Sequence, residues 1–337
     1  MMSSIAELFF SLVIILIAAE IFTNALEHLG QNLRLSQGVT GSILAAVGTA
    51  LPETIVPLLA IISGPTLSSH SEEIGVGAIL GAPLMLSTLS VFLMGLAVIG
   101  KRGLGGYISP EPGGFRRDTG FFLVAFILAT LAMFIPHSML LCRQGISLML
   151  VMLYFLYVYR TIKASHHLVQ EGTGTEAERS LYLSRVVLSE NLPVILLQVI
   201  MGICILLAGA FWFISGVESA SEYFGISALL LSLIIIPIAT ELPEKVNSIL
   251  WIRRGKDTLA VGNITGAMVF QGTLLPAIGI MLTPWEPRTE VLTGIVITLG
   301  AALWLFCGAR KKKMPVAWLG LNGVLYILYI CISLYNR

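Results

Sequence analysis

The sequence predicts an all-α integral membrane protein whose ten transmembrane helices form two inverted five-helix repeats. Three observations support this prediction: a strongly apolar composition, ten apolar segments long enough to span a bilayer, and a motif in the second segment that recurs in the seventh. Of the 337 residues, 56% are hydrophobic and only 12% are charged, whereas roughly 25% are charged in an ordinary soluble domain. The net charge of +1 provides no basic surface of the kind that binds nucleic acid. We therefore expect the membrane lipid bilayer, and no nucleic acid, as a partner.

A membrane helix needs about 20 mainly apolar residues, and ten segments of the chain meet this requirement. They cover residues 5–30, 38–63, 74–99, 119–136, 144–161, 191–215, 226–251, 258–282, 290–308 and 315–335. The longest polar connection separates the fifth segment from the sixth. We therefore expect a first five-helix repeat at residues 1–165, a cytoplasmic connecting loop at 166–189 and a second, inverted repeat at 190–337.

The basic residues support both the number of spans and an orientation, because lysine and arginine favour the cytoplasmic connections of membrane proteins. Of the 20 basic residues, sixteen fall on one side, either in its connections or, for Arg160, at the adjoining end of a segment. Only Arg143, Arg288 and Arg337 fall on the other side, and Lys245 lies inside a segment. This distribution predicts a multi-pass protein with both termini outside. A compact chain without a targeting segment also favours a plasma (inner) membrane.

A duplicated motif indicates that the two halves are related. Residues 48–53 read Gly-Thr-Ala-Leu-Pro-Glu, and residues 239–244 read Ala-Thr-Glu-Leu-Pro-Glu. In the next segment of each half, residues 77–82 read Gly-Ala-Ile-Leu-Gly-Ala and residues 262–267 read Gly-Asn-Ile-Thr-Gly-Ala. A unit of five spans is odd in number, so its second copy enters the membrane from the opposite side. The repeats are therefore expected to be inverted.

Each copy of the motif places a carboxylate, Glu53 or Glu244, inside an apolar segment directly after a proline. An intramembrane carboxylate is costly unless it is paired, hydrated or bound to a cation, so its default interpretation is functional. Proline frees a backbone carbonyl of the preceding turn, and carbonyl and carboxylate oxygens are the ligands that Ca²⁺ and Na⁺ prefer. Thr49 and Thr240 can add hydroxyl oxygens, or can bond their own helix backbone instead. Asn263 can add an amide oxygen.

The paired motifs, each followed by a helix with a Gly-x-x-x-Gly core, resemble the two alpha repeats of the calcium/cation antiporter superfamily, which includes the sodium/calcium exchangers. The resemblance covers both repeats and, in helix count and topology, nearly the whole chain. It implies ten helices in inverted halves, with ion sites where the second, third, seventh and eighth helices meet. It also implies exchange by alternating access, with Glu53 and Glu244 shared between Ca²⁺ and Na⁺ or H⁺.

Several oxygen ligands typical of that superfamily are missing from this sequence. Serine is common at two positions of the paired motifs, and Asn or Asp followed by Ser-Asn is common in the third and eighth helices. The positions that depart from this pattern are Ala50, Ala78, Ala82, Pro83, Glu241, Ala267 and Met268. Fewer oxygens mean fewer simultaneous sites, which argues against three or more bound Na⁺.

Glu241 and Lys245 form an additional charged pair in the seventh segment. They are four residues apart with the glutamate on the N-terminal side, which is the favourable order for a helical ion pair. One hypothesis is that Lys245 neutralises Glu241 and leaves Glu244 for the transported ion. The other is that Lys245 acts as a built-in cation and weakens metal binding.

The sequence therefore predicts a secondary active antiporter that exchanges Ca²⁺ for Na⁺, with small inorganic cations as its cargo, no cofactor and no enzymatic activity. A proton-coupled exchanger of Ca²⁺ or another cation on the same fold is the main alternative. An intramembrane enzyme with Glu53 and Glu244 as acid and base is a minor one, because Lys245 is the only basic residue in a segment that lies more than two residues from the segment's end. A channel is another, although inverted repeats with broken helices fit alternating access better. The oligomeric state stays open.

Overall fold

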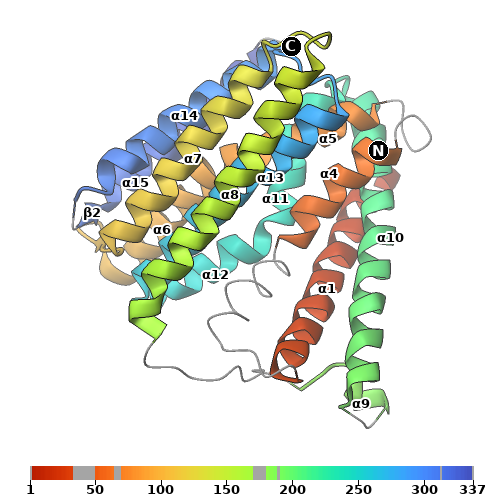
Figure 1. The fold of residues 1–337 in the computed structure, drawn as a ribbon, viewed down its shortest axis with the longest axis horizontal. Coiled ribbons are helices and arrows are strands. Elements are labelled where there is room, and N and C mark those ends of the chain that lie inside the picture. Colours follow the sequence, from red (N-terminus) through yellow and green to blue (C-terminus); the bar gives the residue numbers. More distant parts are fainter. Residues whose placement is uncertain are drawn as a thin grey trace.

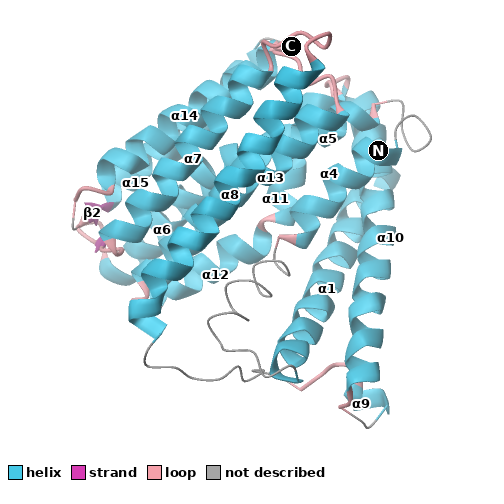
Figure 2. Cartoon of the chain, in the orientation of Figure 1, coloured by secondary structure: helices cyan, strands magenta, loops and turns pink. Residues whose placement is uncertain are grey.

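The chain is almost entirely helical in the part that the computed structural model describes, which is residues 2–32, 50–63, 70–169, 180–187, 190–311 and 313–335 (Figures 1 and 2). The helices are α1 (Met2–Asn32), α4 (Leu51–Ser63), α5 (Ser71–Met85), the π-helical η3 (Leu86–Ser90), α6 (Val91–Arg102), α7 (Pro112–Ala132), α8 (Leu140–Val169), α9 (Ser184–Val187), α10 (Leu192–Phe224), α11 (Ala228–Thr240), α12 (Leu242–Arg253), α13 (Asp257–Leu282), α14 (Thr289–Gly308) and α15 (Val316–Tyr335). Two short strands, β1 (Tyr107–Ile108) and β2 (Met314–Pro315), pair antiparallel. The predicted all-α class is therefore confirmed for these residues.

Six helices of the described residues are long and apolar enough to cross a membrane. They are Ser71–Arg102, which joins α5, η3 and α6, and Leu140–Thr161, Leu192–Phe224, Ala260–Leu282, Thr289–Gly308 and Val316–Ser333. Parts of α4 and α11 are apolar but shorter. Each of the ten predicted segments overlaps a described helix. The number of spans and the inverted arrangement of the halves stay predictions.

The predicted segment 226–251 differs from the structure because it contains two helices. Helix α11 ends at Thr240 and α12 begins at Leu242. Glu241 lies between them with φ −91° and ψ 12°, which is the sparsely populated bridge region. Pro243 thereby falls in the first turn of α12. A backbone N–H in this turn would have no helical acceptor, so proline loses no hydrogen bond there. The proline marks the start of a second helix.

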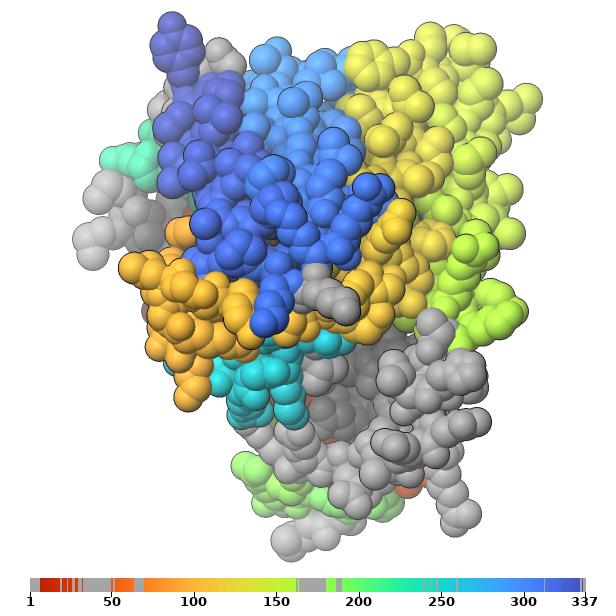
Figure 3. Space-filling view, turned by 90° about the vertical axis from the view of Figure 1, so that its left-hand side faces the viewer, coloured from red at the N-terminus to blue at the C-terminus, as the bar shows by residue number. Residues whose placement is uncertain are grey.

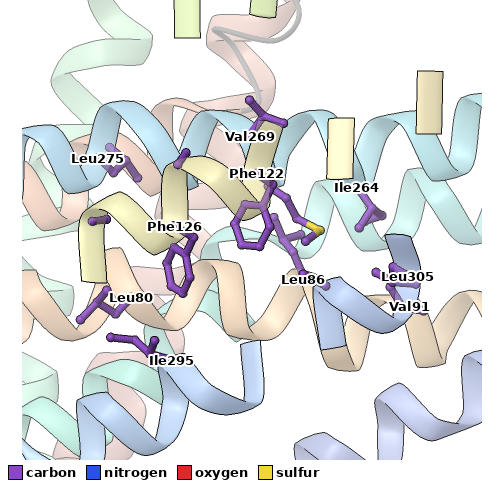
Figure 4. Close-up of a cluster of buried hydrophobic side chains, with 14 of the residues drawn as sticks. Leu80, Leu86, Val91, Phe122, Phe126, Ile264, Val269, Leu275, Ile295 and Leu305 are labelled. Atoms are coloured by element: carbon purple, nitrogen blue, oxygen red, sulfur yellow. The ribbon is translucent and has the colours of Figure 1, made fainter. Parts of the chain in front are cut away.

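The largest hydrophobic core lies where α5, α7, α13 and α14 meet (Figure 4). Phe122 and Phe126 of α7 stack with their ring centroids 5.2 Å apart. Leu80 of α5, Val269 of α13 and Ile295 of α14 belong to the same cluster. This core fixes α5 and α13, which are the helices that follow the two copies of the Leu-Pro-Glu motif.

Glycines let two pairs of helices approach closely. Gly202 of α10 faces α1, which lies beside it in Figure 1, and an added Cβ would lie 3.0 Å from the Cβ of Phe22. Gly81 of α5 faces α11, and an added Cβ would collide with the backbone carbonyl of Leu233. Gly262 of α13 has open space instead. The small-residue run of α5 therefore serves helix packing, whereas its counterpart in α13 does not do so at Gly262.

Ion pairs join the two predicted halves at both ends of the continuous helix Ser71–Arg102. At one end, Arg102 donates hydrogen bonds of 2.9 and 2.6 Å to Asp257, and at the other end Arg288 pairs with Glu73. Burial alone would raise the pKa of Asp257. Hydrogen bonds from Arg102 and from the backbone N–H of Ser109 outweigh this effect and hold that pKa below its ordinary value. The Asp257 carboxylate is therefore charged at neutral pH.

Candidate cation site

Both copies of the Leu-Pro-Glu motif begin a helix. Glu53 lies in the first turn of α4, and Glu244 lies in the first turn of α12. Proline suits this place because its fixed φ matches the helix and its missing N–H is not needed there. A carboxylate in the first turn is stabilised by the helix dipole. The duplicated motif thus sets one carboxylate at the N-terminus of a helix in each predicted half.

Three buried carboxyl groups interact at this place. Glu53, Glu241 and Glu244 are 3%, 0% and 3% exposed. The Glu53 carboxyl interacts electrostatically with both of the others. Neither of its oxygens accepts a hydrogen bond within the described part of the chain. Burying a charged carboxylate without donors is costly, and either protonation or a bound cation relieves this cost.

Lys245 supplies the positive charge of this cluster. Its Nζ lies 3.5 Å from Oε2 of Glu241 and donates a 2.9 Å hydrogen bond to the carbonyl oxygen of Pro237, in α11. The lysine side chain is 5% exposed. The ion pair expected from the sequence spacing is therefore formed, and it bridges the break between α11 and α12.

The other predicted ligands fall into three cases. The Thr240 hydroxyl donates to the carbonyl of Ile236, 3.1 Å away in its own helix, which is the alternative that the sequence left open. The Asn263 amide nitrogen donates to the backbone carbonyl of Glu244 at 3.1 Å and to Ser248 Oγ at 3.1 Å. The amide oxygen of Asn263 is the atom that it can offer to a cation. Thr49 lies outside the described residues.

Sequence reasoning missed two neighbours of Glu241. Gln271 of α13 lies next to Glu241 and is 1% exposed, and Tyr326 of α15 lies near the same carboxyl. Gln271 follows Asn263 by eight residues, so both lie on one face of the helix. A buried amide two turns from a predicted ligand was the available signal. The position of Tyr326 depends on how α15 packs, which no local pattern records.

Three of the positions that lack the typical ligands are buried in the structure and carry side chains without oxygen. Ala78 and Ala82 of α5 and Met268 of α13 are at most 4% exposed. Among the described residues, no three Asp, Glu, His or Cys side chains are close enough to hold one metal ion by themselves. A cation here would need hydroxyl, amide, backbone or water oxygens in addition to carboxylates, as Ca²⁺ sites commonly use.

A family model described as "Sodium/calcium exchanger protein" matches residues 3–163 and 194–335, which are most of the chain. The chain belongs to this family. Each matched range contains its own copy of the Leu-Pro-Glu motif. Membership in the sodium/calcium exchanger family makes the chain a multi-pass membrane protein of a cation-exchanger family, in agreement with its apolar helices.

The chain is also similar to individual proteins. Inner membrane protein YrbG of Escherichia coli (strain K12) is 25% identical over 288 residues, which cover 85% of this chain and 82% of YrbG. The crystal structure of the H⁺/Ca²⁺ exchanger CAX has a TM-score of 0.68 at 18% identity, covering 98% of this chain and 86% of CAX. The sodium-calcium exchanger NCX_Mj has a TM-score of 0.59 at 19% identity, covering 97% of each chain. The two solved structures show a shared fold.

Proposed function

We propose that this exchanger is a secondary active antiporter that exchanges Ca²⁺ for Na⁺ by alternating access, with Glu53 and Glu244 as its central ion ligands. The observation that carries this proposal is the buried Glu53 carboxylate, which accepts no hydrogen bond from the described residues and interacts with Glu244 and Glu241. Hard cations prefer oxygen ligands of this kind. The proposal involves no catalytic step and no cofactor.

The formal charge of the cluster supports a divalent cargo. When ionised, Glu53, Glu241 and Glu244 carry three negative charges, and Lys245 supplies one positive charge. Two negative charges remain, and uncompensated buried charge is unfavourable. One Ca²⁺ balances them, and so do two monovalent cations. The same carboxylates can therefore accept either kind of ion in turn, which is the requirement for exchange.

In this proposal Lys245 neutralises Glu241 and leaves Glu53 and Glu244 for the transported ion. The contacts with Glu241 and with the Pro237 carbonyl hold the ammonium group on the α11 side of the cluster. The rival version is that Lys245 is a built-in cation that weakens metal binding. Replacing both members of the pair, in Glu241→Gln/Lys245→Met, should leave Ca²⁺ affinity nearly unchanged in the first version, because the charge left for the ion stays the same, and should raise it in the second. Unaltered affinity and coupling in Lys245→Met alone would contradict both versions.

Thr49, Thr240 and Asn263 complete the proposed ligand set. Asn263 is supported by its hydrogen bond to the Glu244 backbone, which holds α13 against the start of α12. The Thr240 hydroxyl donates its hydrogen bond to the carbonyl oxygen of Ile236. A lone pair on the hydroxyl oxygen can therefore still coordinate a cation. Thr49 enters only through its equivalent place in the first copy of the motif.

We also propose that residues 1–165 and 190–337 are inverted five-helix repeats joined by a cytoplasmic loop at 166–189. The family match falls in two separate ranges, and both motif copies begin a helix, which supports a duplication. The name of the relative YrbG supports an inner membrane. With both termini outside, alkaline phosphatase fused to the C-terminus should be active and a fused green fluorescent protein should be dark. The opposite pair of signals contradicts this orientation.

A proton-coupled exchanger of Ca²⁺ or another cation is the second candidate. It is favoured by the oxygen-poor positions Ala78, Ala82 and Met268, which leave few ligands for several Na⁺ at once. The fold likeness to the H⁺/Ca²⁺ exchanger CAX is compatible with it. The two candidates differ in the ion that drives Ca²⁺ uptake, so a transport assay separates them.

The test is ⁴⁵Ca²⁺ uptake into proteoliposomes of the purified protein, driven in turn by an outward Na⁺ gradient and by an outward H⁺ gradient. Glu53→Gln and Glu244→Gln remove the proposed ligands. Glu72→Gln, at an exposed carboxylate in the first turn of α5, is the matched control. Uptake with Na⁺ that both ligand variants lose and the control keeps supports the first candidate, and uptake with H⁺ alone supports the second. No uptake under either gradient contradicts both for Ca²⁺.

A further inference from the structure

A groove that contains three arginines lies on the outer surface between α7 and α8, away from the carboxylate cluster. Its volume is about 620 Å³, and its lining includes Arg116 and Arg117 of α7, Arg160 of α8 and one residue of α14. Helices α7 and α8 run side by side in Figure 1, and they form the yellow and yellow-green edge of the face in Figure 3. Because α7 begins and α8 ends here, all three arginines lie at one end of the helix pair.

The rest of the groove is apolar. Phe121 and Val124 of α7, Leu153 and Leu156 of α8 and Phe306 of α14 line it. Gly120, one turn after Arg116 on α7, keeps the groove open because it has no side chain. An added Cβ at Gly120 would meet only a ring carbon of Phe306, at 3.5 Å. A charged end and an apolar body therefore follow one another along the same pair of helices.

The residues that the structure describes neutralise these arginines only partly. Arg117 pairs with Asp118 at 3.2 Å, and that carboxylate also accepts a 2.9 Å hydrogen bond from Thr265. Arg116 lies over the ring of Phe306 at 5.6 Å. Neither Arg116 nor Arg160, both exposed, has an acidic partner among the described residues. The groove therefore keeps a positive charge that an anion can satisfy.

The surroundings of the groove indicate that its occupant comes from the bilayer. The neighbouring side chains of α8 are large, apolar and exposed: Leu148, Met152 and Phe155 are 64%, 61% and 62% exposed. In a multi-pass membrane protein, a surface of this kind faces lipid. The arginines lie in the connections that the distribution of basic residues predicts to be cytoplasmic, where anionic lipids are concentrated.

We propose that this groove binds an anionic phospholipid, with its phosphate on Arg116 and Arg160 and an acyl chain along Phe121, Val124, Leu153 and Leu156. Guanidinium groups suit phosphate because they present several donors in a planar fork. The apolar body explains why a lipid fits better than a free anion, since a free anion would leave that surface covered only by solvent or by bulk lipid. This site is independent of which ions the protein exchanges.

The test is native mass spectrometry of the purified protein in an uncharged detergent, titrated with dioleoylphosphatidylglycerol. Dioleoylphosphatidylcholine serves as the lipid without net charge, and inorganic phosphate serves as the free anion. The double variant Arg116→Gln/Arg160→Gln removes the charge. The matched control is Arg253→Gln/Arg254→Gln, which removes two exposed arginines at the end of α12. Gly120→Leu fills the groove and leaves its charge unchanged.

Wild-type protein should bind the anionic lipid more tightly than the lipid without net charge, and the groove double variant should weaken anionic binding by about tenfold or more. The control double variant should change it less than about twofold. Gly120→Leu should weaken it at least about fivefold, because lost apolar contact reduces binding without any change in charge. Retained melting temperatures in detergent verify that the variants are folded.

Three results would overturn the proposal. Equal losses in both double variants would show a diffuse effect of surface charge. Unchanged lipid binding in Gly120→Leu would show that the apolar groove does not hold the acyl chain. Inorganic phosphate that displaces the lipid at equal concentration would show a site for free anions.

Discussion

The two copies of the Leu-Pro-Glu motif have the same backbone role and different electrostatic surroundings. Glu53 and Glu244 both stand in the first turn of a helix. The second copy adds Glu241, which has no counterpart in the first copy, where Ala50 occupies the equivalent position. It also adds Lys245, which pairs with Glu241 at 3.5 Å. The carboxylate at the helix start is thus common to both copies, and only the second copy has the Glu241–Lys245 ion pair.

The two predicted halves therefore contribute different groups to the carboxylate cluster. The first half contributes a carboxylate without hydrogen-bond donors among the described residues, and it approaches the second half through glycines of α5. The second half contributes a carboxylate beside a fixed charge pair and an amide, Asn263. Substitutions at places where the two copies differ should therefore have unequal effects, whereas the two carboxylates that both copies share should respond alike.

The largest effect is expected for Lys245→Met. It leaves Glu241 buried at 0% exposure without its cation, and breaking one partner of a buried pair costs about 3–5 kcal/mol. The melting temperature in detergent should fall clearly below that of the wild type. The double variant Glu241→Gln/Lys245→Met should recover most of the loss. If Lys245→Met is as stable as the wild type, the Glu241–Lys245 pair does not stabilise the second half.

Ca²⁺ binding should respond to Glu53→Gln and Glu244→Gln alike. Each variant removes one of the carboxylates proposed to share the ion, and a loss of about 3 kcal/mol corresponds to affinity roughly 100-fold weaker. Calorimetric titration in Na⁺-free buffer measures it, with Glu72→Gln as the control. If only one of the two variants loses affinity, the halves do not share one Ca²⁺ and the equivalence of the two carboxylates fails.

The features that depend on local sequence were predictable. Spans, the repeated Leu-Pro-Glu motif and the Glu241–Lys245 pair follow from hydropathy, from recurrence and from i,i+4 spacing, and the structure shows helices at every predicted segment and the ion pair itself. The break at Glu241 was only implied by Pro243. A hydropathy window averages over both sides of such a break, so it reported a single segment over 226–251.

The features that depend on helix crossing were not predictable. Gln271 and Tyr326 reach Glu241 only because α13 and α15 pack around the break between α11 and α12. Helix crossings of this kind depend on contacts between residues far apart in the sequence. One example is the close approach of Gly81 to the Leu233 carbonyl. One sequence alone does not reveal which glycine of a small-residue run makes the contact.

The glycine runs of the two halves allow a matched test of packing. Gly81→Ala should destabilise the protein by about 1–3 kcal/mol, because the new methyl group collides with the Leu233 backbone and overpacking costs this much. Gly262→Ala should stabilise it by roughly 0.5–1 kcal/mol, because the space there is open and alanine favours helix. Thermal unfolding of both variants under one condition checks the opposite signs. Equal shifts would mean that the two runs play the same part.

The smallest effect is expected for Asn263→Ala, at a position where the first half has Ala78. The substitution removes the hydrogen bonds to the Glu244 carbonyl and to Ser248, at about 1 kcal/mol of stability. If the amide oxygen also binds the ion, Ca²⁺ affinity should fall by roughly fivefold. Asn322→Ala is the control, since Asn322 is buried and donates a 2.7 Å hydrogen bond to the Ser87 carbonyl. It should lose similar stability and keep its Ca²⁺ affinity. Equal Ca²⁺ affinities in the two variants would limit Asn263 to a structural role. The second half would then offer no more ion ligands at this position than the first half, which has Ala78.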